Sequence, residues 1–402
     1  MSIIDSLSIR KLLDSRGNPT VEVDVITISG AFGSAIAPAG ASKGSHEVKD
    51  YPPKGVDEAI RVFKEKVMPE LIGLDVLDQR GIDSILHEVD GSENFSNIGG
   101  NVAVATSIAV AKAAADYLGI PLYRYIGGIN SFKIPYPLGN VIGGGKHAIN
   151  GTTIQEFLVL TQADSVKNSI FTNAEIHKAI GKKLKEKLPG VSIGMGDEKA
   201  WVASIKDEEA FQILVDVIDE FKNSTGYRIY PAVDFAASSF YINGKYRYKD
   251  RELSPDEQIE YVSSLVEKYG LFIVEDPLEE NDYEGFARLT EIIGSKCLVV
   301  GDDIFVTNIE RFKKGVEMNA ANAILLKPNQ IGTLTDFIKT VNFAKESGYA
   351  TVFSHRSGET EDSALADIAV GLNGDYIKTG TVGGERTTKL NQLIRIEEEM
   401  EE

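Results

Sequence analysis

Residues 322–331 read NAILLKPNQI, and the position of the lysine in this stretch decides the fold. The apolar run Ile324, Leu325 and Leu326 is typical of a short buried strand. Lys327 follows this run at once, although lysine is one of the residue types that are least often buried. A charged residue directly after a core strand needs a structural explanation, and the sequence around it indicates one.

Polar residues recur in the same place after other apolar runs in the second part of the chain. The runs IYPAV, LFIV, CLVV, AILL, TVF and YI are followed, at once or one residue later, by Asp234, Glu275, Asp302, Lys327, His355 and Lys378. The intervals are 41, 27, 25, 28 and 23 residues, each about one strand plus one helix. In a (β/α)8 barrel these strand ends share the face that carries the active site, whereas an open doubly wound sheet concentrates its site at one switch point. We therefore predict a TIM-type barrel.

The residues before about 130 follow another pattern. In TVEVDVITI, valines alternate with acidic residues from Val21 to Val25, as in a strand with one solvated face. Stretches with helical spacing follow at about 57–71, 78–89 and 100–118. We expect an α/β protein with a smaller α+β domain over residues 1–130 and a barrel domain over residues 131–402.

Composition excludes several classes of function. Sixty acidic residues against 42 basic ones give a formal charge of −18, which argues against nucleic acid or an anionic membrane as the main partner. The single cysteine, Cys297, excludes intramolecular disulfides and cysteine-based metal sites. We expect no signal peptide, because the start of the sequence has no long apolar stretch, and no run is near the ~20 apolar residues of a membrane span. We expect a soluble, cytoplasmic protein.

Three of the strand-end residues are carboxylates. Asp234, Glu275 and Asp302 have no histidine or cysteine beside them, and oxygen-only ligands suit a hard cation such as Mg2+. Each one alone would more often be a helix cap or a loop acid. Three of them at successive strand ends favour a metal site.

Two lysines are expected on the same face. Lys327 or Lys378 alone would more often be a surface residue. Beside metal ions and a second lysine, a lysine can act as a base. Its ordinary pKa of about 10.4 must then fall by roughly 3 units, which costs about 4 kcal/mol.

Two segments upstream offer further candidates. GGGKHAINGTTIQEF places His147 in a glycine-rich loop and puts Gln155 and Glu156 at the start of an apolar strand, and GMGDEKAW contains Asp197 and Glu198. A lone histidine is more often a hydrogen-bonded structural residue, and the acids could simply be solvated. Spacing alone does not choose between these alternatives.

The charges of the candidates suggest a reaction class. Five carboxylates against Lys327, Arg356 and Lys378 leave a net charge of −2, so an anionic substrate becomes acceptable only with metal bound. A base, an acid and metal ions around an anion suggest proton abstraction next to a carboxylate, with an enediolate held by the metal.

Long motifs throughout the chain resemble the enolase (phosphopyruvate hydratase) family. They are DSRGNPTVEV, GASKG, NVIGGGKHA, IQEF, GDE, VEDP, GDDIFVTN, LLKPNQIGTL, SHRSGETED, IKTG and KLNQLIRIEEE. The resemblance implies a barrel that is irregular in its first units, with an antiparallel second strand, and a glycolytic lyase that reversibly dehydrates 2-phosphoglycerate to phosphoenolpyruvate. It also implies a homo-oligomer, either a dimer or an octamer.

The resemblance assigns roles to particular residues. Lys327 would remove the proton from carbon 2, and Glu198, assisted by Glu156, would protonate the hydroxyl that leaves carbon 3, with His147 near the reacting end. Two Mg2+ ions are implied, with Asp234, Glu275 and Asp302 as ligands of the first and Ser42 of the second. The implied substrate-binding residues are Gln155, His355, Arg356, Ser357 and Lys378.

Three places depart from the common family pattern. Lys43 follows Ser42 in the first loop, Lys199 and Ala200 replace a glycine pair after Glu198, and Pro328 follows Lys327 where a bulkier apolar residue is usual. Pro328 should restrict Lys327 to extended backbone.

Two alternatives remain beside enolase. Acid-sugar dehydratases and racemases of the same superfamily typically carry a Lys-x-Lys pair on an early strand, where this chain has IQEF and GDE. The other alternative is a non-catalytic scaffold that kept the fold, against which the retained candidate residues argue.

Overall fold

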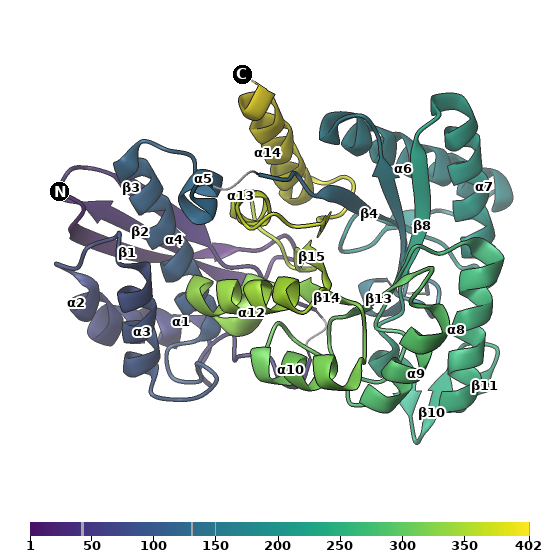
Figure 1. Cartoon of the computed structure of the whole chain (residues 1–402), viewed down its shortest axis with the longest axis horizontal. Coiled ribbons are helices and arrows are strands. Elements are labelled where there is room, and N and C mark those ends of the chain that lie inside the picture. The colour runs from purple at the N-terminus through teal and green to yellow at the C-terminus, as the bar shows by residue number, and fades with distance from the viewer. Residues whose placement is uncertain (42–43, 130–131, 149, 402) are drawn as a thin grey trace.

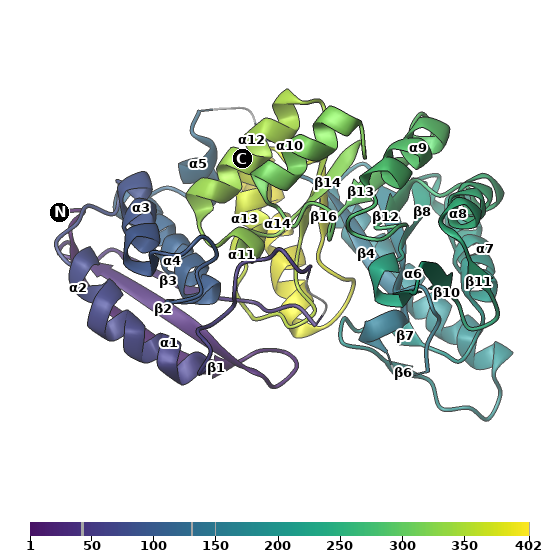
Figure 2. The ribbon, with the colours of Figure 1, turned by 90° about the horizontal axis from the view of Figure 1, so that it is seen from below.

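The computed structural model describes residues 1–41, 44–129, 132–148 and 150–401. Figure 1 shows a small sheet with its helices beside a larger barrel, and the C-terminal helix α14 (Gly384–Glu401) lies between them. Figure 2, seen from below, shows the same two parts at opposite ends of the molecule. Within the described ranges, no helix is both long enough and apolar enough to cross a membrane.

The small sheet is antiparallel, in the order β1-β2-β3. Its strands are β1 (Ile4–Leu13), β2 (Pro19–Thr27) and β3 (Phe32–Ile36). Val21, Val23 and Val25 are fully buried, while Glu22 and Asp24 on the other face pair with a neighbouring arginine. The alternation predicted for this strand is confirmed, because successive side chains of a strand point to opposite faces.

The helices predicted before residue 120 are present. They are α1 (Val56–Val62), α2 (Met68–Leu71), α3 (Gln79–Asp90) and α4 (Gly100–Leu118), and a short helix that was not predicted, α5 (Leu122–Gly127), follows them. A π-helical turn, η1 (Phe63–Val67), joins α1 to α2, so the predicted helix over 57–71 contains one local widening. Gly119 ends α4 in the left-handed conformation, with φ 66°.

Eight strands form the predicted barrel, in the order β16-β15-β14-β13-β12-β8-β5-β4, and the pairing of β16 with β4 closes it. They are β4 (Tyr136–Gly143), β5 (Glu156–Gln162), β8 (Arg228–Asp234), β12 (Ile273–Glu275), β13 (Leu298–Gly301), β14 (Ala323–Leu326), β15 (Ala350–Ser354) and β16 (Tyr376–Lys378). Strand β5 is antiparallel to both of its neighbours. The expected irregular start of the barrel is therefore confirmed.

Helices surround the barrel. They are α6 (Val166–Lys187), α7 (Asp207–Thr225), α8 (Pro255–Tyr269), α9 (Tyr283–Ile293), α10 (Ile309–Met318), α12 (Leu334–Glu346) and α13 (Ala364–Gly371), followed by α14. Short elements fill the loops: η2 (Gly145–His147), β6 (Gly194–Met195), β7 (Trp201–Val202), η3 (Ala237–Phe240), β9 (Tyr241–Ile242), β10 (Lys245–Arg247), β11 (Glu252–Leu253) and α11 (Pro328–Ile331). The sheet of β9, β10 and β11 accounts for the long interval between Asp234 and Glu275.

An ion pair joins the two parts of the molecule. His87 Nε2 of α3 lies 2.7 Å from Asp336 Oδ2 of α12. The hydrogen bond to Asp336 raises the pKa of His87. Burial would raise the pKa of Asp336, but the hydrogen bonds from His87, Lys339 and Thr333 together outweigh burial and lower it. The contribution of this ion pair to stability is therefore complete between about pH 4 and about pH 6.5, where both groups are charged.

We expect His87→Gln to lower the free energy of unfolding at about pH 5.5 by no more than about 1 kcal/mol, because His87 is 44% exposed and screened. The pKa of His87 is higher in the folded protein than in the unfolded chain. Its contribution to the free energy of unfolding is therefore complete below the pKa of the unfolded state and is lost as the pH rises through the pKa of the folded state. The effect of the substitution should therefore shrink by about pH 9. Urea unfolding at the two pH values measures it, with the exposed His46→Gln as control. An equal effect of His87→Gln at both pH values would contradict this account.

Candidate active site

The alternation of side chains along each strand explains how charged residues reach the mouth of the barrel. The barrel interior is filled by Leu138, Leu158, Leu160, Ala232, Ile273, Val300, Ala323, Leu325 and Val352. Two residues beyond Ala232, Ile273, Val300 and Leu325 on the same face stand Asp234, Glu275, Asp302 and Lys327. Strand β5 runs the opposite way, so its first residue, Glu156, reaches the same end and pairs in register with Asp234.

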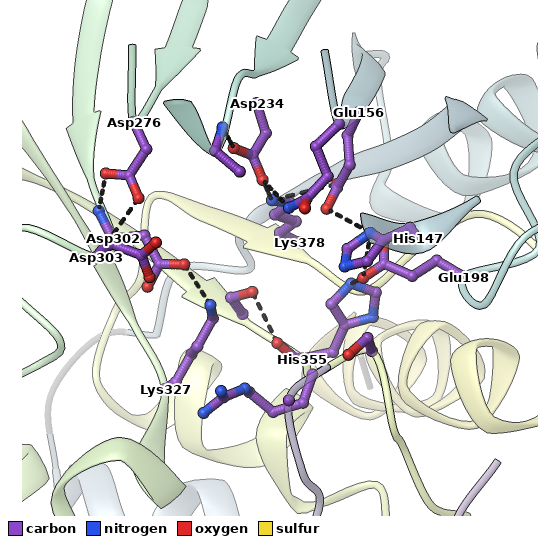
Figure 3. A pocket seen from close by; sticks show the side chains of 16 residues that line it. His147, Glu156, Glu198, Asp234, Asp276, Asp302, Asp303, Lys327, His355 and Lys378 are labelled. Carbon is purple, nitrogen blue, oxygen red and sulfur yellow. Dashed lines mark hydrogen bonds and ion pairs between the residues drawn. The ribbon is translucent and has the colours of Figure 1, made fainter. Parts of the chain in front are cut away.

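A pocket with an empty volume of ≈ 430 Å³ lies at this end of the barrel. The predicted residues that line it are His147, Gln155, Glu156, Glu198, Asp234, Asp302, Lys327, His355, Arg356, Ser357 and Lys378. Glu275 lies beside them, buried and in contact with Lys378. Ser42 falls outside the described residues. Figure 3 shows Lys327 on one side of the pocket and His147 with Glu198 on the other.

Lys378 is a buried cation at the centre of three carboxylates. Its Nζ lies 3.0 Å from Asp234 Oδ2, 2.8 Å from Glu275 Oε2 and 3.2 Å from Glu156 Oε2. Burial lowers the pKa of Lys378, but these carboxylates outweigh burial and raise it well above its ordinary value. In this arrangement of charges the carboxylates favour the protonated form of Lys378.

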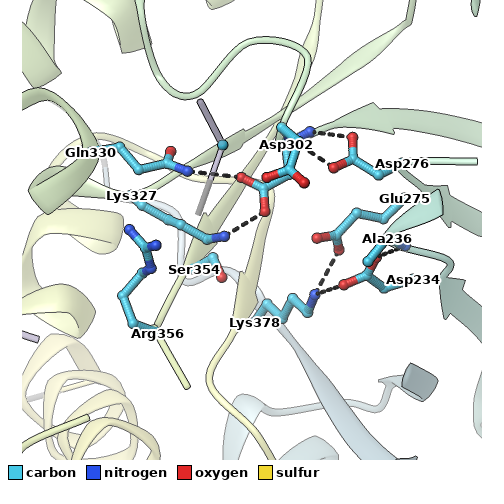
Figure 4. A network of polar contacts seen from close by, with 12 residues as sticks. Asp234, Ala236, Glu275, Asp276, Asp302, Lys327, Gln330, Ser354, Arg356 and Lys378 are labelled. Carbon is cyan, nitrogen blue, oxygen red and sulfur yellow. Dashed lines mark hydrogen bonds and ion pairs between the residues drawn. The ribbon is translucent and has the colours of Figure 1, made fainter. Parts of the chain in front are cut away.

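Lys327 has a different environment (Figure 4). Its Nζ lies 2.5 Å from Asp302 Oδ2. Burial lowers the pKa of Lys327, but the negative charges of Asp302 and Glu275 together outweigh burial and raise it. This direction is opposite to the one expected from neighbouring cations, because the nearest charge is a carboxylate.

Asp302 is held by residues that the sequence patterns had not singled out. Asp276 accepts hydrogen bonds from the backbone N–H of Asp302 (2.9 Å) and of Asp303 (2.7 Å), and Gln330 Nε2 donates to Asp302 Oδ1 at 3.0 Å. Burial, with neighbouring charges, raises the pKa of Asp276 well above its ordinary value and that of Asp303 to about 8. Their place in the VEDP and GDD motifs, next to predicted ligands, was the available signal.

The donor chemistry fits a metal ion. Among the described residues, two groups have ligand atoms within 4.8 Å of one another, Asp276 with Asp302 and Asp303, and His147 with Glu156 and Glu198. The predicted set Asp234, Glu275 and Asp302 is not one of these groups: Lys378 contacts Asp234 and Glu275, whereas Lys327 contacts Asp302. Oε1 of Glu275 is buried and has no hydrogen-bond partner among the described residues. An excess of close, buried carboxylates is what a hard cation would neutralise.

Glu156 and Glu198 both lie beside His147. His147 Nδ1 lies 3.4 Å from Glu156 Oε1 and 3.7 Å from Glu198 Oε1, and Asn140 Nδ2 donates to Glu198 Oε2 at 3.1 Å. Burial and the charge of Glu198 raise the pKa of Glu156 well above its ordinary value. Burial would also raise the pKa of Glu198, but His355 and His147 outweigh it and lower that pKa. Of the two carboxyl groups, Glu156 therefore holds a proton more readily than Glu198.

Loops from both parts of the molecule hold the predicted anion-binding residues. Arg356 donates to the two oxygens of Glu47 at 2.9 and 3.1 Å, and Ser357 Oγ accepts from the backbone N–H of Ala41. Gln155 Nε2 lies 3.5 Å from Asp234 Oδ2. The sequence reasoning did not predict Glu47, since it comes from a loop with no strand pattern.

Two of the sequence departures have structural counterparts. Lys199 has φ 61°, a left-handed conformation that glycine adopts without strain, and its carbonyl accepts from His177 Nε2 at 2.8 Å. Lys327 has φ −126° and ψ 113°, so the extended backbone predicted from Pro328 is confirmed. Lys43 falls outside the described residues.

Comparison with known proteins agrees with this geometry. The family model described as the enolase N-terminal domain matches residues 4–126, and that of the enolase C-terminal TIM barrel domain matches residues 131–402. Proteins named enolase from Thermoplasma acidophilum and Picrophilus torridus are 51% and 50% identical over 98% and 99% of both chains. An enolase from Methanothermobacter thermautotrophicus is 50% identical, over 99% of this chain and 97% of its own. The chain belongs to the enolase family.

Proposed function

We propose that the chain reversibly dehydrates 2-phosphoglycerate to phosphoenolpyruvate, with Lys327 as the base and Glu198 as the acid. Enolase activity, which is a lyase activity, follows from the family, and we add the roles of the residues. The observation that carries these roles is that a lysine and a glutamate pair occupy different sides of one buried, highly charged pocket. A base on one side and an acid on the other can act on neighbouring carbons of one bound molecule.

As the base, Lys327 removes the proton from carbon 2 next to the substrate carboxylate. Burial and the positive charges of Arg356 and Lys378 act on its pKa in the direction that a base requires, whereas Asp302 and Glu275 act against it. Neutralising those two carboxylates therefore favours the free amine.

We propose Mg2+ as the metal, with Asp234, Glu275 and Asp302 as ligands of a first ion and Ser42 of a second. Bound there, Mg2+ would supply positive charge that offsets the carboxylates and stabilises the enediolate. The oxygen-only donor set and the unpaired Glu275 oxygen support this choice.

Glu198, with Glu156, delivers a proton to the hydroxyl that leaves carbon 3. We assign the delivered proton to these two glutamates, and both are buried, since Glu198 is 4% exposed and Glu156 2% exposed. The proton held by the two glutamates can pass to the leaving oxygen during dehydration. The glutamates can take the proton back during hydration, as a reversible reaction requires. His147, beside both carboxylates, lies near the reacting end.

The remaining residues hold the charged ends of the substrate. Lys378 and Arg356 supply fixed positive charge, and Arg356 has the planar donor geometry that suits phosphate and carboxylate. Gln155, His355 and Ser357 add hydrogen-bonding groups around them.

We further propose a cytoplasmic homo-oligomer, either a dimer or an octamer, whose chain divides into domains at residues 1–130 and 131–402. The acidic composition supports a small-molecule substrate over nucleic acid. A separate hydrophobic cluster built from residues between Ile4 and Ala114 supports the division.

Ultraviolet absorbance tests the function directly. Purified protein with 2-phosphoglycerate and Mg2+ should produce a steady rise from the conjugated enol phosphate, and excess chelator should stop it. Restoring Mg2+ in excess over the chelator should restart the rise, which controls for damage to the protein. A folded protein that gives no rise would contradict the reaction, and acid-sugar substrates would then be tested first. A rise that persists in chelator would contradict the metal.

A further inference from the structure

Arg386, on α14, is completely buried although its charge is permanent. Its guanidinium donates to the backbone carbonyls of Arg356 and Ser357, the latter at 2.7 Å, and reaches that of Asp197 at 3.4 Å. The nearest carboxylate oxygen, Oε1 of Glu385, lies 3.6 Å from its Nε. One side chain therefore ties the loop that precedes Glu198 to the loop that contains Arg356 and Ser357.

The remaining contact of Arg386 fixes the chemistry of a histidine. Its Nη1 lies 2.8 Å from Nδ1 of His355. A guanidinium only donates, so Nδ1 must accept and carries no hydrogen. The proton of a neutral His355 then resides on Nε2, which lies 3.4 Å from Glu198 Oε1.

The surroundings of His355 keep the ring neutral. The charged groups that face it are Arg386 from α14, Glu198 from its loop and Glu359 from the loop after β15. Burial, with Arg386, lowers the pKa of His355 to about 4. A neutral ring has two tautomers, and only one of them has an acceptor facing Arg386.

We propose that Arg386 is a positioning residue that holds His355 in its Nε2–H tautomer and thereby orients Glu198. In this tautomer the N–H of His355 has one oxygen of Glu198 as its neighbour at 3.4 Å, longer than an ordinary hydrogen bond, while Asn140 donates to the other oxygen at 3.1 Å. In the opposite tautomer a ring lone pair would face the carboxylate and repel it. The tautomer follows from the contacts alone, whereas its effect on turnover rests on the proposed role of Glu198.

Nitrogen NMR of the wild-type protein tests the tautomer without any variant. Protein labelled with 15N at its five histidines should give one pair of signals, absent in His355→Gln, with a pyridine-type Nδ1 and a pyrrole-type Nε2 that persist from about pH 6 to about pH 9. A protonated Nδ1, or a mixture of tautomers, would overturn the inference even if the protein turns over 2-phosphoglycerate. Failure of turnover with the expected tautomer would instead contradict the proposed function.

Arg386→Met and Arg386→Lys test the effect on catalysis. We expect Arg386→Met to lower kcat about 10- to 100-fold, by analogy with the loss of a partner that orients a metal ligand. Loss of the guanidinium should let the pKa of His355 rise, so the acid-side fall of kcat should move to higher pH. Arg386→Lys, which can still donate to Nδ1, should recover part of kcat and the original pH profile.

The matched control is Arg288→Met, which removes an exposed arginine from α9 and should leave kcat and its pH profile unchanged. A folded Arg386→Met protein with wild-type kcat and pH profile would overturn the claim that Arg386 supports turnover through His355 and Glu198. If Arg386→Met does not fold, the comparison of Arg386→Lys with wild type and the histidine spectrum decide the question.

Discussion

Lys327→Ala is expected to lower kcat about 10⁴-fold, the upper end of the range for a positioned general base. Its side chain ends at the mouth of the barrel, two residues after the inward-facing Leu325, and the other lysine among the described pocket residues is Lys378. Lys378 is surrounded by three carboxylates that keep it protonated. The KM should change less, because Lys378 and Arg356 still supply the positive charge that holds the substrate.

Hydrogen exchange at carbon 2 shows which step is lost in Lys327→Ala. Wild-type protein in deuterated water should exchange that hydrogen of 2-phosphoglycerate during turnover, and the variant should not, because the proton is never removed. Lys339→Ala, which removes an exposed lysine from α12, is the control and should behave like wild type. Exchange at the wild-type rate in a folded Lys327→Ala protein would exclude Lys327 as the base.

Glu198→Gln is expected to lower kcat by about 10²- to 10⁴-fold for a different reason. Glutamine preserves the shape of the side chain and can still accept from Asn140, but it cannot give a proton to the leaving hydroxyl. The first step does not need Glu198, so exchange at carbon 2 should continue while formation of the enol phosphate nearly stops. The two variants therefore separate proton removal from loss of the hydroxyl.

The control for Glu198→Gln is Glu260→Gln, the same substitution at an exposed position of α8. Thermal unfolding of both variants with Mg2+ checks that the fold is kept. If Glu198→Gln lost exchange at carbon 2 together with turnover, Glu198 would be needed for the first step and its assignment as the acid for carbon 3 would be wrong.

The sequence by itself determined the barrel and most of the pocket. Apolar runs followed by Glu275, Asp302 and Lys327 at intervals of 27 and 25 residues, about one βα unit each, specify parallel strands with one charged end. The motifs identified the family and, through it, the candidate residues. These signals are local. Both the alternation of side chains along a strand and the combined length of a strand and a helix are visible in residues that follow one another in the chain.

Tertiary structure alone decided how those charges are paired. Lys327 contacts Asp302 while Lys378 contacts Asp234, although both lysines end strands in the same way. Glu47 reaches Arg356 across 309 residues of chain, and Arg386 reaches His355 from the C-terminal helix. No periodicity records such contacts, because they depend on how separate elements pack and on which neighbours burial leaves within hydrogen-bonding distance.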